Sequence, residues 1–399
     1  MRDRYDVVIS GGGVAGLSAA ALLGDAGFRV ICADPAEPVT DPDAPGADLR
    51  TTALLQPARD LLARAGLWDR FGTAPTPLRV MRIVEAGADG TAPQVIRDFD
   101  SDDISDRPFG WNLPNWLLRR EMLARISELE HVVFRPGVSV AALLCRDSEA
   151  LVRLSDGTRL RADLVIAADG RTSFVRQAAG IGVKTRRYSQ KALSFAVTHA
   201  APHDGVSTEI HRSGGPFTLV PLPDHQGQPC SAVVWMEHGA EAQRLAALPE
   251  AEFEAAMTDR SCELWGPLKL ASRRSVWPIV SQIAHRMSGT RVALVAEAAH
   301  VVPPIGAQGL NMSLEDLHVL MDLALKAPRG LGDETMLRVY HRRRHWEVAA
   351  RVAGIDLLNR TSRAGSPAMR RVRALGLNAF YAVPPLRRNL MRLGLGARG

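Results

Sequence analysis

The residues best suited to chemistry near the start of the chain are three glycines and one acid. Gly11, Gly13 and Gly16 form a Gly-x-Gly-x-x-Gly turn that directly follows the apolar stretch 5–10. Asp34 ends a second apolar stretch about 20 residues later, the interval typical of a strand–helix–strand unit. In that context the turn predicts a binding site for the phosphates of a dinucleotide.

Each residue type has a physical reason to stand where it does. Gly11 permits a tight turn, and Gly13 lets the backbone approach a pyrophosphate. Val14 and Ala15 open the helix, where unpaired N–H groups and the helix dipole favour an anion. Gly16 allows the helix to pack closely on the strand, and the carboxylate after the second strand accepts hydrogen bonds from a ribose.

Two later segments place further polar residues after apolar strands. Asp169-Gly170 closes the stretch 164–168. Residues 297–311, which read Glu-Ala-Ala-His-Val-Val-Pro-Pro-Ile-Gly-Ala-Gln-Gly-Leu-Asn, connect the apolar stretch 291–295 to a long helical pattern through a Gly/Pro-rich loop. Neither segment is needed for a simple glycine turn, so they narrow the choice of cofactor.

Together the three segments resemble those of the p-hydroxybenzoate hydroxylase-type (class A) FAD monooxygenases, and the resemblance covers about residues 5–330. In that family the glycine turn holds the ADP half of FAD, and the Asp-Gly segment lies near the pyrophosphate and the nicotinamide path. The third segment holds the ribityl chain and flavin ring. The stretch 48–54, with Asp-Leu-Arg-Thr-Thr-Ala-Leu, and the loop 306–311 are similar to the ubiquinone-biosynthesis hydroxylases.

The resemblance implies a set of cofactor-binding residues. In the two later segments they are Asp169, Glu297, Pro304, Gly306, Gly309, Leu310 and Asn311. It also places Arg50 near the flavin, Arg120 at the FAD pyrophosphate and the backbone of Val138 beside the adenine. Solvated or salt-bridged side chains are the alternative for the two arginines.

One pair departs from the family pattern. The third segment usually starts Gly-Asp, and this chain has Ala296-Glu297. Glutamate keeps a carboxylate for a ribityl hydroxyl but is longer by one methylene. Alanine is tolerated there unless the backbone needs a positive φ. We expect FAD binding to survive, with a change in affinity.

No catalytic base stands out, and neither the cysteines nor the histidines are spaced as a metal site. His300 adjoins the third segment, but the flavin chemistry needs no imidazole there, so we expect a structural histidine bonded to backbone at a turn. Phe195, Phe217, Trp235 and Met236 could line a substrate pocket, although aromatics at strand spacing are more often core.

The elements that position these residues predict an α/β protein. We expect an FAD-binding Rossmann-like (GR2-type) domain, an inserted β-sheet substrate domain and a helical C-terminus. A helix is predicted from about Thr52 to Ala65, and Asp156-Gly157 predicts a hairpin turn. The predicted FAD-binding domain comprises 1–76, 111–182 and 276–330, the substrate domain comprises 77–110 and the β-rich 183–275, and the basic helical region is 331–399.

Charge is distributed unevenly along the chain. The whole chain carries +6, but the part from Arg329 onward holds 15 Arg, no Lys and 4 acids. Near the C-terminus Leu386, Leu390 and Leu393 share one predicted helix face opposite Arg388 and Arg392. Such a helix suits contact with an anionic membrane surface, and a helix packed on the FAD domain is the alternative.

No apolar run is long enough to span a bilayer and no signal peptide is visible, so we expect a cytoplasmic protein, peripheral on the inner membrane if the tail binds lipid. No nucleic-acid-reading module accompanies the basic charge, and nucleic acid is not expected as a partner.

By resemblance, the expected enzyme takes electrons from transiently bound NADPH or NADH. It uses O₂ to form a flavin C4a-hydroperoxide and hydroxylates an aromatic ring, best matched by a polyprenylated phenol of ubiquinone biosynthesis. Two alternatives stay open. One is a hydroxylase of a soluble phenol or polyketide, and the other is a non-catalytic flavin-binding scaffold of a biosynthetic complex.

Overall fold

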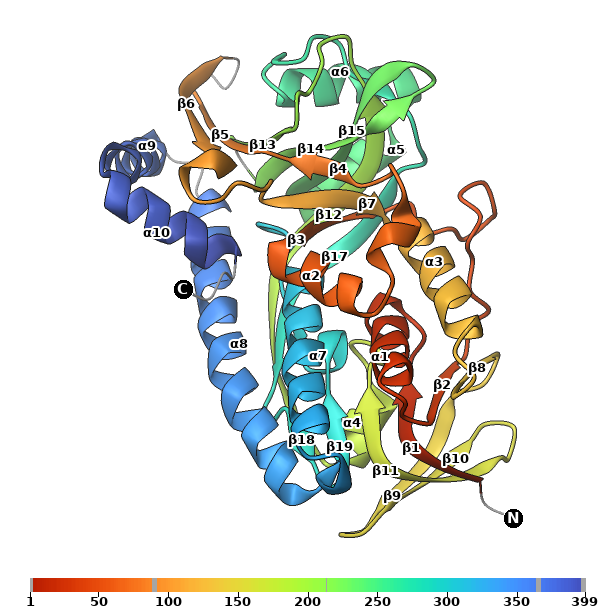
Figure 1. Ribbon diagram of the computed structural model, residues 1–399. Helices are drawn as coiled ribbons and strands as arrows, with labels where there is room; N and C mark the ends of the chain where they lie inside the picture. The colour runs from red at the N-terminus through yellow and green to blue at the C-terminus, as the bar shows by residue number, and fades with distance from the viewer. Residues whose placement is uncertain (1–2, 88–91, 213, 364–366, 396–399) are drawn as a thin grey trace.

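A computed structural model describes residues 3–87, 92–212, 214–363 and 367–395 (Figure 1). Two large sheets and one small sheet form its framework, with helices packed around them. Short elements complete it: η1 (Trp68–Phe71), η2 (Ser101–Asp103), α4 (Phe174–Ala178), β16 (Lys269–Leu270), η3 (Ala296–Ala298) and η4 (Pro328–Gly330).

The first sheet carries the predicted dinucleotide unit. Its order is β18-β19-β11-β1-β2-β8, and β11, β1, β2, β8 and β19 run parallel. Their bounds are β1 (Asp3–Ser10), β2 (Val30–Asp34), β8 (Val132–Pro136), β11 (Arg159–Ala167), β18 (Ser288–Gly289) and β19 (Val292–Leu294). The antiparallel strands β9 (Val140–Cys145) and β10 (Ala150–Leu154) extend from β11. The predicted hairpin turn is confirmed, because Gly157 takes φ +89° between β10 and β11.

The helices beside this sheet are built from small and aliphatic residues. In α1 (Val14–Asp25), ten of the twelve residues are buried, and the helix packs on α3 (Asn115–Ser127) and α7 (Gln308–Lys326). Such close packing on several sides requires the Ala-rich sequence of α1, because larger side chains would hold the neighbours apart. The loop that ends α1 turns at Gly27, where φ is +85°.

The second sheet contains the strands predicted for a substrate domain. Its order is β20-β17-β12-β15-β14-β13-β5-β6. The bounds are β5 (Val80–Ala86), β6 (Pro93–Asp100), β12 (Val183–Thr198), β13 (Val206–His211), β14 (Pro216–His225), β15 (Gln228–His238), β17 (Ser275–Ala284) and β20 (His300–Val301). Strand β17 continues this sheet to residue 284, beyond the boundary expected at 275.

One face of the second sheet has a hydrophobic core of its own. Phe195, Phe217 and Trp235 are buried there, and their rings meet one another or Phe253 of α6 (Glu250–Arg260) edge-on or tilted. Helix α5 (Gly239–Ala247), which the sequence pattern did not indicate, adds buried apolar residues to this core. Met236 is buried instead in the core shared with the FAD domain. The interpretation of these aromatic residues as core is confirmed.

The small third sheet corrects one expectation. The predicted helix from Thr52 begins late, because β3 (Thr51–Leu55) pairs with β7 (Gly110–Pro114), which also pairs with β4 (Thr76–Leu78). Helix α2 (Gln56–Arg64) starts only where Pro57 can occupy its first turn. The β-branched Thr51 and Thr52 favour the strand, and cross-strand pairing decides the boundary.

The C-terminal region is helical as predicted, with α8 (Glu334–Arg363), α9 (Pro367–Ala382) and α10 (Pro384–Leu395). In Figure 1, α8 runs along one side of the molecule and α9 and α10 lie across its end. Met336, Leu337, Tyr340, Val348 and Ile355 of α8 are buried in the main core. Within the described ranges, none of the helices has the length and hydrophobicity needed to traverse a bilayer.

Candidate active site

The predicted site residues meet at one edge of the first sheet. Ser10 lies in register with Ala33 and Ala167, and Ala167 with Leu294. Because these strands run parallel, their carboxyl ends share an edge, and ligands of open α/β sheets bind outside that edge. The glycine turn, Asp34, the Asp-Gly segment and Glu297 directly follow those strand ends and are therefore neighbours.

The glycine turn has room for a ligand at only one of its three glycines. Gly11 has φ +107°, and a Cβ there would lie 2.3 Å from the Ala168 carbonyl oxygen. A Cβ on Gly16 would lie 1.9 Å from the carbonyl oxygen of Gly11. A Cβ on Gly13 would meet nothing within 4 Å. Gly11 and Gly16 are therefore needed for the fold, whereas Gly13 leaves open space at the N-terminus of α1.

Asp34 is fixed beside that opening. Its Oδ2 accepts a hydrogen bond from the Gly12 N–H at 2.6 Å, and its Oδ1 accepts one from the Ala36 N–H at 2.8 Å. The Val138 N–H donates to the Asp34 carbonyl oxygen at 3.0 Å, so the predicted adenine neighbour does lie next to the predicted ribose ligand.

Arg120 is engaged by residues of its own helix, α3. Its Nε donates to Glu121 at 2.8 Å, its guanidinium lies 5.3 Å from the Trp116 ring centroid, and its side chain is 52% exposed. In this conformation Arg120 is salt-bridged, which is the alternative to a contact with the FAD pyrophosphate.

Asp169 presents a buried acceptor. One oxygen, Oδ2, accepts from the Val175 N–H at 3.1 Å, while Oδ1 is buried without a hydrogen-bond partner among the described residues. A buried oxygen of this kind costs free energy unless a ligand or water satisfies it. Together with the open space at Gly13, it fits a bound dinucleotide.

Arg50 is oriented by a carboxylate that the motif reading did not single out. Its Nε and Nη2 donate to the two oxygens of Asp48 at 2.7 Å each, and Asn115 Nδ2 donates to the same carboxylate at 3.0 Å. Burial raises the pKa of Asp48, but these hydrogen bonds outweigh it and the pKa lies below its ordinary value. The Arg50 guanidinium lies 5.5 Å from the Trp277 ring centroid.

The hydrogen bond with Asp48 raises the pKa of Arg50, and the negative charge of Glu297 adds to the effect. Arg50 and Glu297 are thus close enough to interact, although they are far apart in the sequence. The only sequence signal for the clamp was the spacing of Asp48 two residues before Arg50.

The backbone is strained at Ala296, where the chain departs from the family pattern. Its φ is +54°, in the left-handed region where an L-residue costs about 1–2 kcal/mol more than in the right-handed region. Ala307, after Gly306 in the loop before α7, also has a positive φ of +55°. Both alanines stand at conformations that favour glycine, and the first is where the family has glycine.

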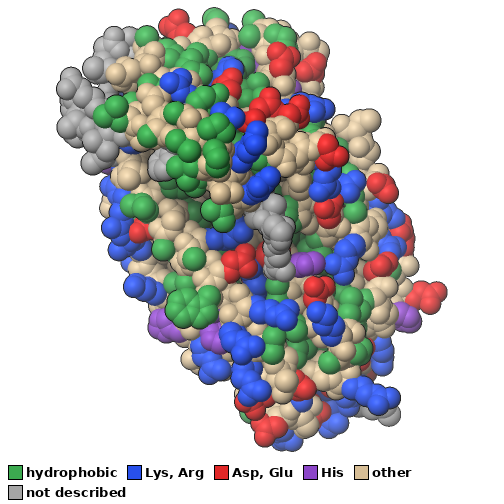
Figure 2. Space-filling model, turned by 60° about the vertical axis from the view of Figure 1, so that its left-hand side comes forward, with side chains coloured by type: hydrophobic (Ala, Val, Ile, Leu, Met, Phe, Trp, Pro, Cys, Tyr) green, Lys and Arg blue, Asp and Glu red, His purple; other side chains and the backbone are tan. Residues whose placement is uncertain are grey.

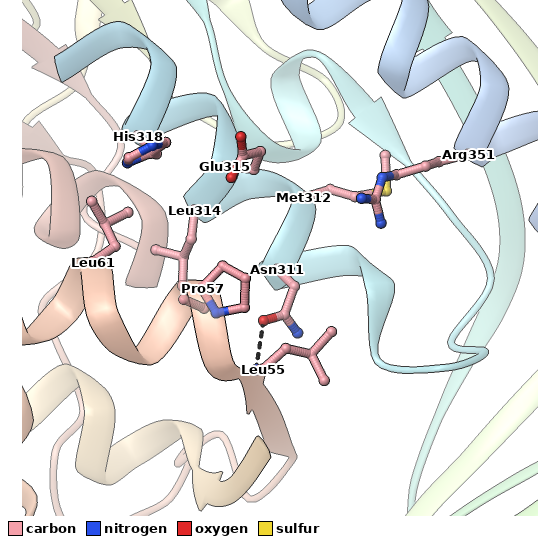
Figure 3. Close-up of a pocket in the computed structure, with 10 residues that line it drawn as sticks. Leu55, Pro57, Leu61, Asn311, Met312, Leu314, Glu315, His318 and Arg351 are labelled. Carbon is pink, nitrogen blue, oxygen red and sulfur yellow. Dashed lines mark hydrogen bonds between the residues drawn. The ribbon is translucent and has the colours of Figure 1, made fainter. Parts of the chain in front are cut away.

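Asn311 secures the loop rather than offering its amide to a ligand. Its Oδ1 accepts from the Leu55 N–H at 2.9 Å, and its Nδ2 donates to the Ala53 and Ala307 carbonyls at 2.7 Å each. Figure 3 shows it pointing toward Leu55 from the first turn of α7, at a shallow pocket between α2 and α7. It thereby holds β3 against the first turn of α7, which contains Gly309 and Leu310, and against the loop before it, which contains Pro304 and Gly306.

A buried ionic cluster around Asp316 holds residues 296–300, at the start of the segment that ends at Asn311. Asp316, 0% exposed, accepts hydrogen bonds from His300 Nε2 at 2.7 Å, Arg344 Nε at 2.8 Å and the Ala296 N–H at 3.2 Å. Burial raises the pKa of Asp316, but the His300 and Arg344 charges outweigh it and the pKa lies below its ordinary value. His300 is therefore structural, as expected, but its partner is a carboxylate and the predicted backbone bond is wrong.

This geometry agrees with comparisons to known proteins. A family model described as "FAD binding domain" matches residues 4–354. The chain belongs to this FAD-binding family. It is 33% identical over 395 residues to ubiquinone hydroxylase UbiL of Rhodospirillum rubrum, covering 98% of this chain and 89% of the relative. It is 27% identical to 3-demethoxyubiquinol 3-hydroxylase of Escherichia coli, covering 98% of both chains.

Solved structures show the same fold. PqsL of Pseudomonas aeruginosa, a probable FAD-dependent monooxygenase, has a TM-score of 0.78 and 24% identity, covering 94% of this chain and all of its own. The p-nitrophenol 4-monooxygenase PnpA of Pseudomonas putida has a TM-score of 0.79 and 20% identity, covering all of both chains. The resemblance and the expected FAD-binding fold are confirmed, and the protein is an FAD-dependent monooxygenase.

Replacing Ala296 with glycine should stabilise the protein. Glycine removes the left-handed strain of about 1–2 kcal/mol but gains freedom in the unfolded chain, leaving a net gain of about 0.5–1 kcal/mol. Urea unfolding of the flavin-free protein measures it. Ala298→Gly, at a buried position without positive φ, is the control and should destabilise. A lower free energy of unfolding in both variants would contradict the strain assigned to Ala296.

Asp316→Asn should destabilise by about 3–5 kcal/mol at pH 7, because it leaves the buried Arg344 without its counter-charge. The folded-state pKa of Asp316 lies below the unfolded value of about 4, so its contribution is full above that pH. This stabilising contribution of Asp316 is lost as the pH falls through its folded-state pKa.

The difference in unfolding free energy between wild type and Asp316→Asn should therefore narrow below about pH 4. Urea unfolding followed by tryptophan fluorescence between about pH 2 and 7 measures it. Asp147→Asn, at an exposed position, controls for general charge effects. A difference that stays constant over this range would show that the Asp316 charge does not carry the stability.

Proposed function

We propose that this protein hydroxylates the aromatic ring of a polyprenylated phenol in ubiquinone biosynthesis. The observation that carries the proposal is the meeting of the glycine turn, Asp34, Asp169 and Glu297 at one sheet edge. The pathway is suggested by the two hydroxylases named above and by human COQ6, a ubiquinone biosynthesis monooxygenase 27% identical over 97% of this chain and 92% of its own.

The ADP half of FAD would lie at the N-terminus of α1. The backbone N–H groups of Val14 and Ala15 would face the pyrophosphate through the space left by Gly13. Asp34 would accept hydrogen bonds from the adenosine ribose, and Val138 would border the adenine. Arg120 would reach the pyrophosphate only by exchanging its hydrogen bond with Glu121 for the phosphate.

The flavin half would lie where Arg50 and Glu297 approach each other. Asp48 fixes the guanidinium of Arg50, so less rotamer entropy is lost when it meets a ligand. Glu297 is exposed, and its carboxylate would accept hydrogen bonds from ribityl hydroxyls. The segment from Pro304 to Asn311 would border the ring, with Asn311 acting through its grip on β3.

When bound, FAD supplies the redox and oxygen-transfer chemistry, with NADPH or NADH as a transient donor and O₂ as co-substrate. The chain's own task is to position the aromatic ring and exclude water. The face of the second sheet that carries Val234, Met236 and Trp277 packs on the FAD-domain core and suits that task. The aromatics Phe195, Phe217 and Trp235 occupy the opposite face and take no part.

A polyprenyl chain partitions into lipid, so we place the enzyme in the cytoplasm at the inner membrane. In α10 the leucines at 386, 390 and 393 are 40%, 43% and 70% exposed. A neighbouring side of this helix is anchored, because Arg387 forms a salt bridge with Asp103 at 3.0 Å and Met391 is buried. An exposed leucine face with arginines beside it supports contact with an anionic membrane.

The purified protein should show a flavin spectrum that NADPH or NADH bleaches without oxygen and that returns with air. A short-chain prenylated phenol should give a product heavier by one oxygen atom. Glu297→Gln should weaken FAD binding about tenfold or more, as expected for a lost charge-assisted hydrogen bond. Exposed Glu130→Gln is the control. A colourless protein that takes up no FAD would refute the proposal.

Deleting residues 366–399 should weaken co-sedimentation with vesicles that contain anionic phospholipid, because the deletion removes α9 and α10. Retained flavin absorption shows that the shortened protein is folded. If the full chain hydroxylates the prenylated phenol but binds no vesicles, the ring chemistry stands and the membrane contact is wrong.

A further inference from the structure

Helix α8 exposes a continuous stripe of side chains along its length. Arg338, Arg342, Trp346, Ala350 and Leu357 are all exposed and are spaced by four or seven residues, which places them on one side of the helix. We call these five residues the α8 stripe. The opposite side of α8 is buried in the main core. The stripe is therefore the outer surface of a firmly packed helix.

The apolar members of the stripe are unusually exposed. Trp346 is 76% exposed and Leu357 63%, and the adjacent Leu358 is 57% exposed. Of the fourteen large hydrophobic side chains exposed among the described residues, seven lie on α8, α9 and α10. Such a concentration on one side of a protein marks an interaction surface rather than scattered surface residues.

Further positive charge lies near the stripe. Arg343 is exposed beside it, and β12, whose Arg186 and Tyr188 bond Asp356 of α8, also carries the exposed Lys184. Strand β12 pairs with β17, and β17 packs on α8, so these charges lie on neighbouring elements. Figure 2 shows Lys and Arg side chains interspersed with hydrophobic ones on the side of the molecule along which α8 runs.

The acids close to this surface are already engaged. Asp356 pairs with Arg186 and with Arg360, the latter at 2.7 Å. Glu347 pairs with Arg344 at 2.5 Å and Arg351 at 3.3 Å. From 357 to the end, the chain has nine Arg and no acid. The surface as a whole is therefore positive, and its counterpart must be negative.

We propose that the α8 stripe is a second membrane-binding element, on which the protein lies with α8 parallel to an anionic lipid bilayer. The arginines would meet lipid phosphates, Trp346 would enter the interface and Leu357 would reach the acyl region. At 1.5 Å per residue the stripe from Arg338 to Leu357 offers a line of contact about 28 Å long. A second copy of this chain fits less well, because it would bring one basic surface against another.

The inference rests on the proposed membrane location but assigns it to a helix outside the 366–399 segment. It predicts that deletion of 366–399 leaves residual vesicle binding. It also predicts that the two elements, α8 and α10, contribute separately.

Vesicle co-sedimentation of the full-length FAD-bound protein tests it, using phosphatidylcholine vesicles with and without phosphatidylglycerol. The double variant Trp346→Ala, Leu357→Ser should bind anionic vesicles at least about tenfold more weakly, since it removes two large apolar side chains from the interface. Leu144→Ser on β9, where the leucine is 55% exposed, is the matched control and should bind like wild type. Flavin absorption checks that each variant is folded.

Reversing charge with Arg342→Glu and Arg343→Glu should remove the preference for anionic over neutral vesicles. If the stripe variants bind like wild type and only the 366–399 deletion lowers binding, the stripe inference is wrong and the tail contact stands. If the wild type binds no vesicles, both membrane assignments fall, while turnover of a prenylated phenol would still support the ring chemistry. A concentration-dependent dimer that Trp346→Ala weakens, seen by sedimentation velocity without lipid, would instead assign the stripe to a second copy.

Discussion

A single buried carboxylate joins the parts of this protein that must stay in register. Asp316 is fully buried, so water cannot solvate its charge and partners from within the chain must stabilise it. It finds them in His300 and the Ala296 N–H on one side and Arg344 on the other. Residues 296–300, α7 and α8 are thus tied at one point. The C-terminal helix α8 is in this way fixed to the strand end that carries Glu297.

That attachment explains how a strained segment can persist. Ala296 and Ala307 adopt left-handed conformations that alanine does not favour. Asp316 holds the first residue by its N–H, and Asn311 holds the second by its carbonyl. Local strain of about 1–3 kcal/mol is retained where surrounding contacts determine the backbone. The loop is therefore preformed for a ligand at a small cost in stability.

The division of labour between the two faces of the second sheet follows from strand alternation. Trp235 and Met236 are neighbours in the chain but belong to different cores. The aromatic face stabilises the sheet with α5 and α6, which leaves the other face to meet the FAD domain. Because α8 also packs on this sheet through β17, its outer stripe has a fixed orientation relative to the site.

The sequence by itself determined the dinucleotide unit, because glycine turns and strand-ending acids follow from local backbone geometry, and it indicated FAD through the resemblance of three segments to a known family. It also indicated the helical, basic C-terminus. Only the tertiary structure decided that β3 replaces the first turn of a predicted helix, that Asp48 orients Arg50, and that Asp316 binds His300 and Arg344. The β3–β7 pairing and the Asp316 cluster depend on partners distant in the sequence, which only folding brings together, and the Asp48–Arg50 pair depends on a side-chain conformation that adjacency alone does not determine.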